Sequence, residues 1–379
     1  MELQTPNTDY VRPLELPATN VAIVHDWLTG TRGGERILEA LCELLPSATI
    51  FTLLHVPGSV SERIEERLIR TSFVQHLPCL RKHYRLYLPL FPRAIESLDL
   101  SGFDLVISVS HCVAKGAVAA EGALSICICL TPMRYAWDQI DTYFPPKRLA
   151  NRLLVRPLMK RLRTWDSKTA DRVHHFVAIS NFVAKRITRC YGRRSEVIYP
   201  PVDLSRFTVE PDSVQDYYLI VSAFAPYKRL SVAIEAFKRL NRRLRVIGQG
   251  QEERRLKALA TENVEFLGAL SDEEVAKHLT RCKALIFPGV EDFGIVPLEA
   301  LASGRPVVAY GAGGVLETIR DGVTGVLFHE QTPEALIDAI HRADSTRFEP
   351  DELRSSVEQF DACVFKRRMS EFIAEKMNA

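Results

Sequence analysis

The strongest constraint on the fold is a regular alternation of short apolar runs with segments of helical periodicity. Between the apolar runs VAIVHDW at 21–27 and FDLVISVS at 103–110, the segment GERILEALCELL at 34–45 repeats its apolar residues at the spacing of an amphipathic helix. Further strand-type runs follow at 124–130 and 175–180. Parallel strands need crossover connections, and helices usually provide these connections and cover both faces of the sheet. The pattern therefore predicts an α/β domain built on a parallel sheet.

The same alternation begins again after a proline-rich stretch. Consecutive prolines in VIYPPVDLSRF at 197–207 stop both a helix and a central strand, so this stretch is the expected linker. A chain of 379 residues is also too long for one ordinary core and fits two domains of about 150 to 200 residues. Strand-type runs of the second series lie at 217–224, 244–250, 264–268, 284–289, 306–311 and 325–328, and helical segments at 231–240, 272–279 and 296–303.

The predicted fold is therefore an α/β chain of two Rossmann-like domains that face each other across a cleft. We expect an N-terminal extension at 1–19, a first domain at 20–203 and a second domain at 204–360. The last segment, 361–379, is predicted as a helix that can pack on either domain, including a return to the N-terminal one.

The charge balance and the cysteines exclude several classes of protein. Lys and Arg number 49 and Asp and Glu 47, and the resulting net charge of +2 gives no footprint for nucleic-acid binding. No segment approaches the roughly 18 apolar residues of a membrane span, and the N-terminus lacks the apolar stretch of a signal peptide. The eight cysteines form no CxxC pair and show no metal-ligand spacing. We expect a cytoplasmic protein with reduced thiols.

One local segment is strongly basic. KRLANRLLVRPLMKRLR at 147–163 contains seven Lys and Arg residues and no acid, interleaved with leucines. A basic amphipathic helix suits an anionic membrane surface or an acidic partner. A helix with its apolar stripe in the core and a solvated basic face explains the segment equally well. Pro157 argues against one continuous, regular helix.

The stretch that points most directly to chemistry is PGVEDFGIVPLEALASGRPVVAYGAGG at 288–314. Here a strand is predicted to end, a Phe293-Gly294 turn follows, and a helix begins near Ile295. The backbone N–H groups of Gly294, Ile295 and Val296 then point to the C-terminal edge of the strand. The helix dipole favours an anion such as a diphosphate at that position.

Two carboxylates flank this turn. Glu291 precedes it, and Glu299 lies in the first turns of the helix. A carboxylate accepts paired hydrogen bonds from vicinal hydroxyls, so acids on both sides of an anion site can hold two diols, a sugar and a ribose. A glutamate pair alone is more often solvated surface, whereas the strand-turn-helix context favours a ligand site.

Together with other ordered motifs, these residues resemble glycosyltransferase family 4, and most closely its bacterial O-antigen mannosyltransferase-like members. The resemblance implies a glycosyltransferase B-type fold, a nucleotide-sugar donor, retention of anomeric configuration and no metal or other cofactor. It implies that Glu291 contacts the donor sugar and Glu299 the ribose. It further implies GDP-mannose as donor and a glycan or lipid-linked oligosaccharide acceptor in cell-surface polysaccharide synthesis. The other motifs are HDWLTGTRGGER (25–36), SHCVAKG (110–116), TPMRYAWD (131–138), PPVD (200–203) and PYKR (226–229).

The PYKR motif places Lys228 just after a strand of the second domain, at the edge where α/β sheets bind ligands. A cation there offsets the charge on a leaving diphosphate, so we expect a catalytic role for Lys228. Family members often carry an arginine a few residues earlier, where this chain has Ala223, and the adjacent Arg229 is the candidate to compensate. A solvated helix start is the structural alternative for both cations.

Two glycine turns follow strand-type runs. Gly248 and Gly250 in VIGQGQ, and Gly33 and Gly34 ahead of a helix in the first domain, allow a backbone to approach a nucleotide or its diphosphate. Such turns also simply connect a strand to a helix, so each is a weak signal by itself.

One departure from the family pattern lies at Leu130. Relatives of this branch usually carry a histidine before TPMRY that touches the donor sugar, and leucine cannot form that hydrogen bond. His111, which ends the neighbouring strand, is therefore a candidate catalytic residue; a different donor preference and low turnover are the alternatives. His25 and Asp26, at the end of the first strand, fit cleft, capping or core positions equally.

Two other function classes compete with the transferase. A nucleotide-sugar-binding protein that has lost catalysis would account for Leu130 and Ala223, and it would bind a donor without turnover. A nicotinamide-dependent dehydrogenase shares the fold type but requires a GxGxxG motif after its first strand, and this chain has no convincing one.

Overall fold

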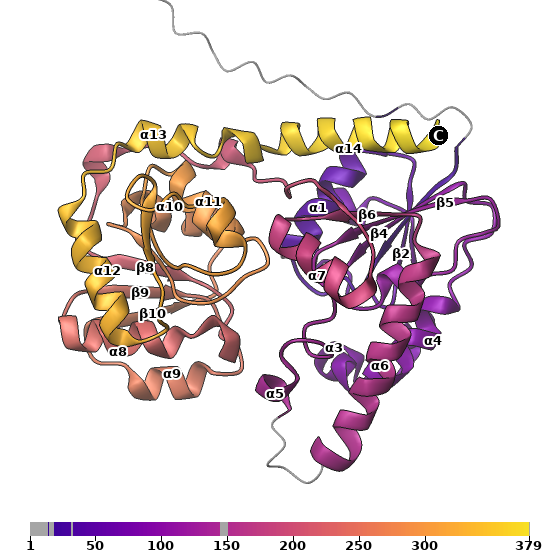
Figure 1. Ribbon diagram of the computed structural model, residues 1–379, viewed down its shortest axis with the longest axis horizontal. Coiled ribbons are helices and arrows are strands. Elements are labelled where there is room, and N and C mark those ends of the chain that lie inside the picture. The colour runs from indigo at the N-terminus through magenta and orange to yellow at the C-terminus, as the bar shows by residue number, and fades with distance from the viewer. Residues whose placement is uncertain (1–13, 15–18, 32, 145–150, 379) are drawn as a thin grey trace, which may run out of the picture. The chain divides into compact units, whose positions relative to one another are not determined.

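The computed structural model describes residue 14 and residues 19–31, 33–144 and 151–378 of the chain. The chain divides into two units (Figure 1). Unit 1 comprises Met1–Pro201 and Ala362–Ala379, and unit 2 comprises Val202–Asp361. The division falls within the proline-rich stretch, two residues before the boundary at 203 that the sequence predicts.

Unit 1 is built on a parallel sheet with the strand order β3-β2-β1-β4-β5-β6-β7. Its two central strands are paired in register, with Ile23 opposite Ile107. Both are buried along their whole length, which explains their continuous apolar runs. The strands are β1 (Val21–His25), β2 (Thr49–Thr52), β3 (Ile69–Thr71), β4 (Leu105–Ser110), β5 (Leu124–Cys129), β6 (His175–Ala178) and β7 (Glu196–Val197).

The last helix of the chain, α14 (Ala362–Met377), belongs to unit 1. Figure 1 shows it beside α1, and the Nζ of Lys366 donates to the carboxylate of Glu43 in α1 at 2.9 Å. The predicted C-terminal helix thus packs on the N-terminal Rossmann-like unit. The other α-helices described in unit 1 are α1 (Gly33–Leu44), α2 (Glu62–Glu65), α3 (Leu80–His83), α4 (Phe91–Glu96), α5 (Ile140–Tyr143), α6 (Arg156–Thr169) and α7 (Asn181–Tyr191).

Unit 2 has a second parallel sheet, with the order β10-β9-β8-β11-β12-β13. Numbered within the unit, this order is 3-2-1-4-5-6, the arrangement of Rossmann folds. The strands are β8 (Tyr218–Val221), β9 (Leu244–Ile247), β10 (Val264–Gly268), β11 (Leu285–Phe287), β12 (Val307–Tyr310) and β13 (Gly325–Phe328). The α-helices are α8 (Leu230–Leu240), α9 (Glu253–Leu259), α10 (Asp272–Arg281), α11 (Ile295–Ala302), α12 (Pro333–Ser345) and α13 (Pro350–Ser355).

Local sequence signals account for several helix ends in both units. The predicted helix at 272–279 corresponds to α10, which begins with a capping box because Ser271 and Glu274 exchange side-chain and backbone hydrogen bonds. In unit 1, α7 starts where the Ser180 side chain accepts the Val183 N–H, and it ends at Gly192, whose φ is +67°. The α/β prediction with two Rossmann-like sheets is confirmed.

In each sheet the strand order reverses once, between β1 and β4 in unit 1 and between β8 and β11 in unit 2. Ligands of open α/β sheets bind outside the carboxyl ends of the strands at such a switch point, because the loops diverge there and leave space. Residues that follow these four strands are therefore the first candidates for chemistry.

The basic segment predicted at 147–163 begins outside the described residues. From Asn151 to Val155 the chain forms a π-helical turn, and α6 then starts at Arg156 with Pro157 in its first turn. Proline is tolerated there because the N–H that it lacks would have no partner within the helix. Within the described ranges, every helix is too short or too polar to span a membrane.

Candidate functional site

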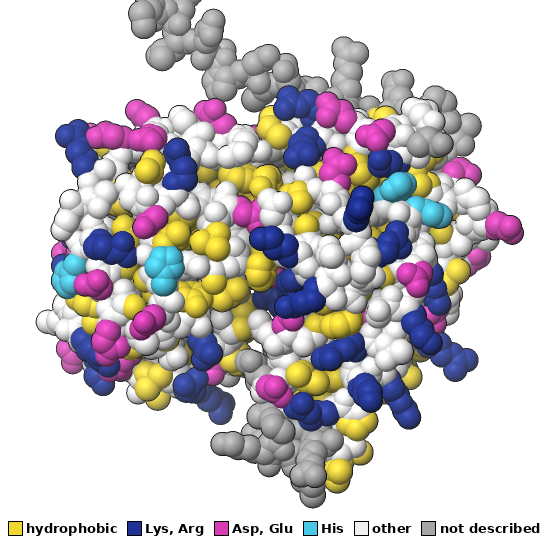
Figure 2. Space-filling model, viewed as in Figure 1, with side chains coloured by type: hydrophobic (Ala, Val, Ile, Leu, Met, Phe, Trp, Pro, Cys, Tyr) yellow, Lys and Arg dark blue, Asp and Glu magenta, His cyan; other side chains and the backbone are white. Residues whose placement is uncertain are grey.

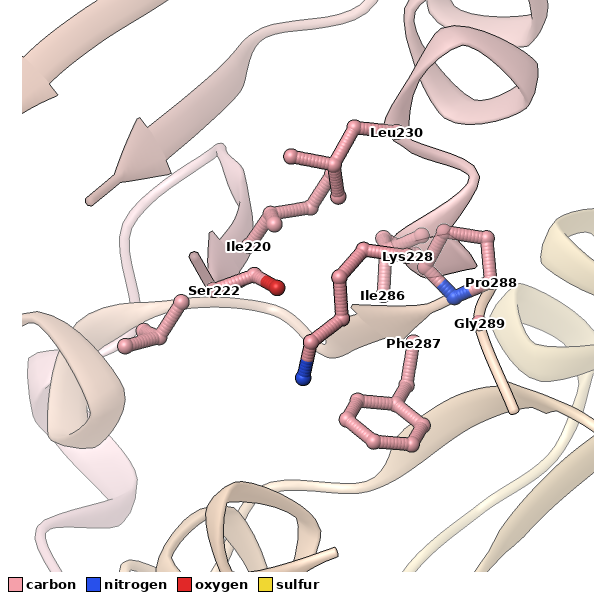
Figure 3. Close-up of a pocket in the computed structure, with 9 residues that line it drawn as sticks. Ile220, Ser222, Lys228, Leu230, Ile286, Phe287, Pro288 and Gly289 are labelled. Carbon is pink, nitrogen blue, oxygen red and sulfur yellow. The ribbon is translucent and has the colours of Figure 1, made fainter. Parts of the chain in front are cut away.

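In unit 2, a lysine and a glutamate meet at the switch point. Lys228 ends the 3-10 helix Pro226–Lys228 that follows β8, and its Nζ forms an ion pair with Oε1 of Glu291, which follows β11. The side chains of Lys228 and Glu291 are only 16% and 14% exposed. Figure 3 shows the Lys228 side chain extending into a pocket that Ser222 and Phe287 also line. An ammonium group has three donors, so Lys228 can hold a phosphate oxygen and keep its carboxylate partner.

The helix after β11 supplies backbone donors at the same edge of the sheet. Gly294 is the N-cap of α11 with φ +93°, a conformation that glycine adopts without steric cost. The helix begins at Ile295, as the sequence predicts. Glu291 is fixed just before it, because its carbonyl oxygen accepts the Gly314 N–H at 2.9 Å. The N–H groups of Ile295 and Val296 lie in the first turn, where a helix has no internal acceptors and favours an anion.

Glu299 and Phe293, two other predicted donor contacts, differ in how deeply they are buried. Glu299 is half-buried in α11, one turn beyond the helix start. Phe293 is only 3% exposed, and its ring packs against Phe360 with centroids 5.7 Å apart. Its side chain therefore serves the packing of unit 2, and its backbone is the part that leads into the Gly294 cap.

The cation beside Lys228 and the glycine turn after β9 also have defined positions. Arg229 is exposed and has φ +54°, whereas Lys228 lines the pocket. A side chain at Gly248 would overlap the carbonyl oxygen of Ser222, and a Cβ at Gly250 would lie 2.7 Å from that of Phe224. The two glycines therefore allow the turn after β9 to pack on the segment that leads to Lys228, a structural reason that the sequence pattern alone does not show.

In unit 1, the switch point contains a fully buried carboxylate, Asp26, directly after β1. Its Oδ2 accepts the backbone N–H groups of His111 and Cys112 at 2.7 and 2.9 Å. Its Oδ1 accepts those of Val113 and Ala114 at 2.6 and 2.7 Å. One side chain thus satisfies four consecutive backbone donors in the loop after β4.

Asp26 also holds the ring of His111. The Nδ1 atom of His111 lies 3.0 Å from Oδ2 of Asp26, and the ring stands edge-on to Trp27 with centroids 4.6 Å apart. Burial opposes ionisation of Asp26, yet the charge and hydrogen bonds of His111 outweigh it and lower the pKa of Asp26 to about 2. The His111 side chain is 31% exposed, so the predicted catalytic histidine is open to a ligand on one side.

A second histidine–carboxylate pair lies beneath the glycine loop after β1. Nε2 of His25 is 3.4 Å from Oε1 of Glu35 in the first turn of α1, and both side chains are buried. Burial opposes the charge on Glu35, but the hydrogen bond and charge of His25 lower its pKa. A Cβ at Gly34 would lie 2.8 Å from Leu130 and 3.3 Å from His25. Leu130 is therefore part of this site, next to the loop of Gly33 and Gly34.

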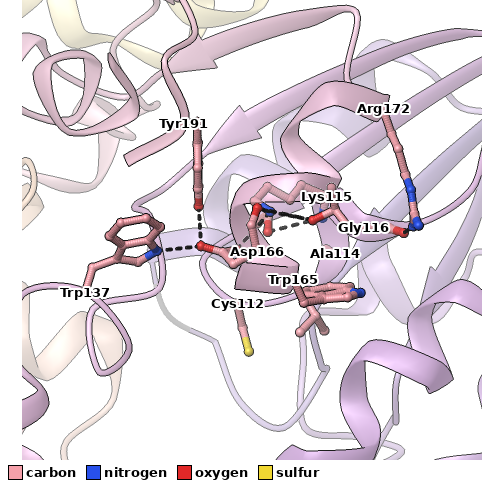
Figure 4. Close-up of polar contacts among 12 residues, drawn as sticks. Cys112, Ala114, Lys115, Gly116, Trp137, Trp165, Asp166, Arg172 and Tyr191 are labelled. Carbon is pink, nitrogen blue, oxygen red and sulfur yellow. Dashed lines mark hydrogen bonds and ion pairs between the residues drawn. The ribbon is translucent and has the colours of Figure 1, made fainter. Parts of the chain in front are cut away.

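A buried ion pair fixes the far end of the loop after β4 (Figure 4). Nζ of Lys115 lies 2.8 Å from Oδ1 of Asp166 in α6. The other carboxylate oxygen of Asp166 accepts hydrogen bonds from Nε1 of Trp137 at 2.7 Å and from the hydroxyl of Tyr191 at 2.9 Å. Burial and the charge of Asp166 raise the pKa of Tyr191 well above its ordinary value. Lys115, Asp166 and Tyr191 are buried and Trp137 is partly buried, so this network is structural.

Sequence reasoning identified neither the role of Asp26 nor the Lys115–Asp166 pair. The only signal for Asp26 was its place at the end of an apolar strand, where a polar residue is either buried with partners or directed at a ligand. Among the described residues, no three His, Cys, Asp or Glu side chains are grouped so that they could hold a metal ion.

Two family models match the chain, one for each unit. The model of the group 1 glycosyl transferases matches residues 202–359, and the model of glycosyltransferase family 4 matches residues 31–206. Together they extend from the first helix of unit 1 almost to the end of unit 2.

Curated relatives and solved structures agree with these matches. The chain is 30% identical over 169 residues to an uncharacterized glycosyltransferase of Methanocaldococcus jannaschii, which covers 43% of this chain and 48% of the relative. It is 28% identical over 204 residues to O-antigen chain mannosyltransferase C of Escherichia coli, which covers 48% of this chain and 54% of the relative. The chain thus matches about half the length of these relatives. The crystal structure of HepE from Anabaena in complex with UDP-glucose superposes with a TM-score of 0.72 at 16% identity, over 94% of this chain and 99% of that one.

The two Rossmann-like units, with their parallel sheets, define a protein of the glycosyltransferase B-type fold. With both family models matched in order along the sequence, the chain belongs to glycosyltransferase family 4.

Proposed function

We propose that this protein transfers a hexose from a nucleotide-diphosphate sugar to a hydroxyl group of a glycan or lipid-linked acceptor. The observation that carries the proposal is the Lys228–Glu291 pair at the switch point of unit 2, on the same sheet edge as the N-terminus of α11. A diphosphate requires a cation and N–H donors, and a sugar requires carboxylate acceptors. Membership of family 4 supports the same class of reaction.

In the proposed reaction, the acceptor oxygen forms a bond to the anomeric carbon of the hexose. The bond from that carbon to the diphosphate oxygen breaks, and its electron pair leaves with the nucleoside diphosphate. The proton of the acceptor hydroxyl passes to the departing phosphate. Attack and departure take place on the same face of the sugar, so the product retains the anomeric configuration.

We assign the electrostatic part of catalysis to groups of unit 2. Lys228 and the N-terminus of α11 stabilise the charge that develops on the diphosphate, so no metal is needed for it. Glu291 contacts the donor sugar and positions Lys228, and His111 of unit 1 contacts the transferred sugar. The remaining proposed donor contacts are Glu299 at the ribose, Arg229, and the backbones of Gly33, Gly34, Gly248, Gly250, Phe293, Gly294, Ile295 and Val296.

The proposed donor is GDP-mannose, and the proposed acceptor is a lipid-linked oligosaccharide at the inner face of the cell membrane. The O-antigen mannosyltransferase among the relatives supports mannose and a surface polysaccharide. The structural neighbour HepE was crystallised with UDP-glucose, so a uridine nucleotide sugar is the alternative donor to test.

A contact with anionic lipid through α6 completes the proposal. Leu153 and Leu154, just before this helix, are 60% and 72% exposed. Lys160, Arg161 and Lys168 are exposed along α6, and Figure 2 shows Lys and Arg side chains gathered over this part of unit 1. Exposed leucines beside cations favour the surface of an anionic bilayer. Reversal of the charges of Lys160 and Arg161 should abolish binding to phosphatidylglycerol vesicles, and unchanged binding would remove this part of the proposal.

The test of the function is a transfer assay with GDP-mannose, UDP-glucose and UDP-galactose and lipid-linked oligosaccharides as acceptors. We expect product from one donor only, with the anomeric configuration of the donor in its proton NMR spectrum. Binding of a donor without any product would support the binding-only protein instead. Neither binding nor product would overturn the proposed function.

A further inference from the structure

We propose that Asp26 is a positioning residue that holds His111 with Nε2 directed at a hydroxyl of the transferred sugar. The inference deepens the proposed function and rests on it. Neither Asp26 nor its pairing with His111 follows from the family motifs of unit 2.

The backbone that carries His111 is held in place by Asp26. Asp26 accepts four successive N–H groups, so the loop after β4 is tied to the end of β1 at every residue from His111 to Ala114. Sγ of Cys112 lies 2.7 Å from the hydroxyl of Tyr135, within the TPMRY motif. With the Lys115–Asp166 ion pair at its far end, the loop has little freedom to move.

Asp26 and Trp27 also hold the ring of His111. Nδ1 of His111 lies 3.0 Å from the Asp26 carboxylate, so Nδ1 carries the proton and donates a hydrogen bond to Oδ2. Trp27 packs edge-on against the ring and limits its rotation. In the neutral ring Nε2 then has only its lone pair, so it accepts a hydrogen bond from an alcohol. A carboxylate that fixes the tautomer of a histidine in this way serves as its orienter.

The buried carboxylate of Asp26 limits the kind of ligand that this edge of unit 1 can bind. Four N–H groups after a strand would ordinarily form a cradle for a phosphate. Here the buried carboxylate of Asp26 already fills it, and a second anion would be repelled. The loop after β4 is therefore suited to an uncharged sugar hydroxyl and not to a phosphate.

Leu130 belongs to the same part of unit 1. It lies near His25, because both would contact a Cβ at Gly34. The ring of His25 is in turn 6.5 Å from that of His111. His111 thus follows the neighbouring strand β4, and Leu130, whose side chain is apolar, supplies no hydrogen-bonding group beside it.

The first test is independent of activity. In protein labelled with ¹⁵N-histidine, the two-bond nitrogen–proton correlations of His111 should show Nδ1 protonated, and His111→Gln assigns the signal. In Asp26→Asn the preference for Nδ1–H should be lost. A His111 ring protonated on Nε2 in the wild type would overturn the proposal, whether or not the protein transfers a sugar.

The second test separates positioning from general damage to the fold. His111→Gln keeps the backbone N–H groups bound by Asp26, so it should fold normally and lower kcat about tenfold or more, with KM for the donor little changed. His83→Gln, at an exposed histidine of the same unit, is the matched control. Asp26→Asn should also lower kcat.

The double variant gives the decisive comparison. If Asp26 acts through His111, adding Asp26→Asn to His111→Gln should reduce kcat no further. Effects that multiply would show that Asp26 acts elsewhere, and an unchanged kcat in His111→Gln would remove His111 from the reaction. Failure of the proposed function would be distinct, because the wild type would then transfer no sugar at all.

Discussion

The two units use the same place in the fold for opposite purposes. Each switch point brings together two polar groups, one after the first strand of the central pair and one after the other strand. In unit 1 the acid comes first, as Asp26, and the histidine His111 second. In unit 2 the cation comes first, as Lys228, and the acid Glu291 second.

The difference lies in where the hydrogen bonds go. Asp26 is completely buried and gives both oxygens to the backbone, so it has no capacity left for a ligand. Lys228 lines a pocket and retains 16% exposure. Charge at a switch point therefore does not by itself mark a ligand site: in unit 1 it organises a loop, whereas in unit 2 it lines a pocket.

The largest expected effect is on stability, at Asp26. Asp26→Asn places an amide NH₂ against backbone N–H donors in a buried site, and this should lower the free energy of unfolding by about 3 kcal/mol. Urea denaturation at neutral pH measures the change. Glu291→Gln, at the partly exposed pair of unit 2, should cost less than about 1 kcal/mol. An equal decrease in the free energy of unfolding of the two variants would contradict the proposed difference between the units.

The next effect is on catalysis, at Lys228. Lys228→Ala removes the cation at the diphosphate and should lower kcat about 100-fold, while the midpoint of urea denaturation changes little. Steady-state kinetics with a saturating donor measure it, and Lys238→Ala, at an exposed lysine of α8, is the control. A normal kcat in this variant would instead support the alternative that Lys228 is a solvated residue at the start of a helix.

The acid dependence of stability should separate the units further. The pKa of Asp26 is about 2 in the folded protein, below the ordinary value of 3.8, so the group stabilises the fold above pH ~4 and this contribution is lost as the pH falls through about 2. A shift of this size corresponds to about 2 kcal/mol. The difference in unfolding free energy between wild type and Asp26→Asn should therefore narrow between pH 5 and pH 2.5, and a constant difference would contradict the assignment.

The smallest effect is expected at Glu299. Glu299→Ala removes one acceptor for the ribose hydroxyls and should weaken nucleotide binding about tenfold without changing the fold. Competition binding of the nucleoside diphosphate measures it, with Glu317→Ala in the same unit as a comparison. An unchanged affinity of Glu299→Ala for the nucleoside diphosphate would show that the ribose does not bind at α11.

Much of the fold could be predicted from the sequence because its signals are local. Continuous apolar runs mark the buried parallel strands, and the prolines at 200 and 201 mark the division of the chain. The start of α11 at Ile295 follows from the Phe-Gly turn before it. The placement of Lys228 and Glu291 at one sheet edge follows from each being next to a predicted strand.

The rest depends on contacts between distant segments. No spacing rule links Asp26 to a loop 85 residues further along the chain, and none shows that Gly248 is required by the carbonyl of Ser222. Likewise, Phe293 belongs to a motif, but only packing against Phe360 reveals that its ring is interior. Tertiary structure decides such roles, because one residue type can serve a ligand or a neighbour equally well.

The central claim is that unit 2 binds a nucleotide sugar at its switch point, and calorimetric titration tests it most directly. Wild-type protein and Lys228→Ala would be titrated with GDP, GDP-mannose, UDP and UDP-glucose. We predict saturable binding of one nucleotide and its sugar to the wild type, with heat signals much weakened in the variant. Equal binding to both proteins, or no binding of any of the four, would contradict the account.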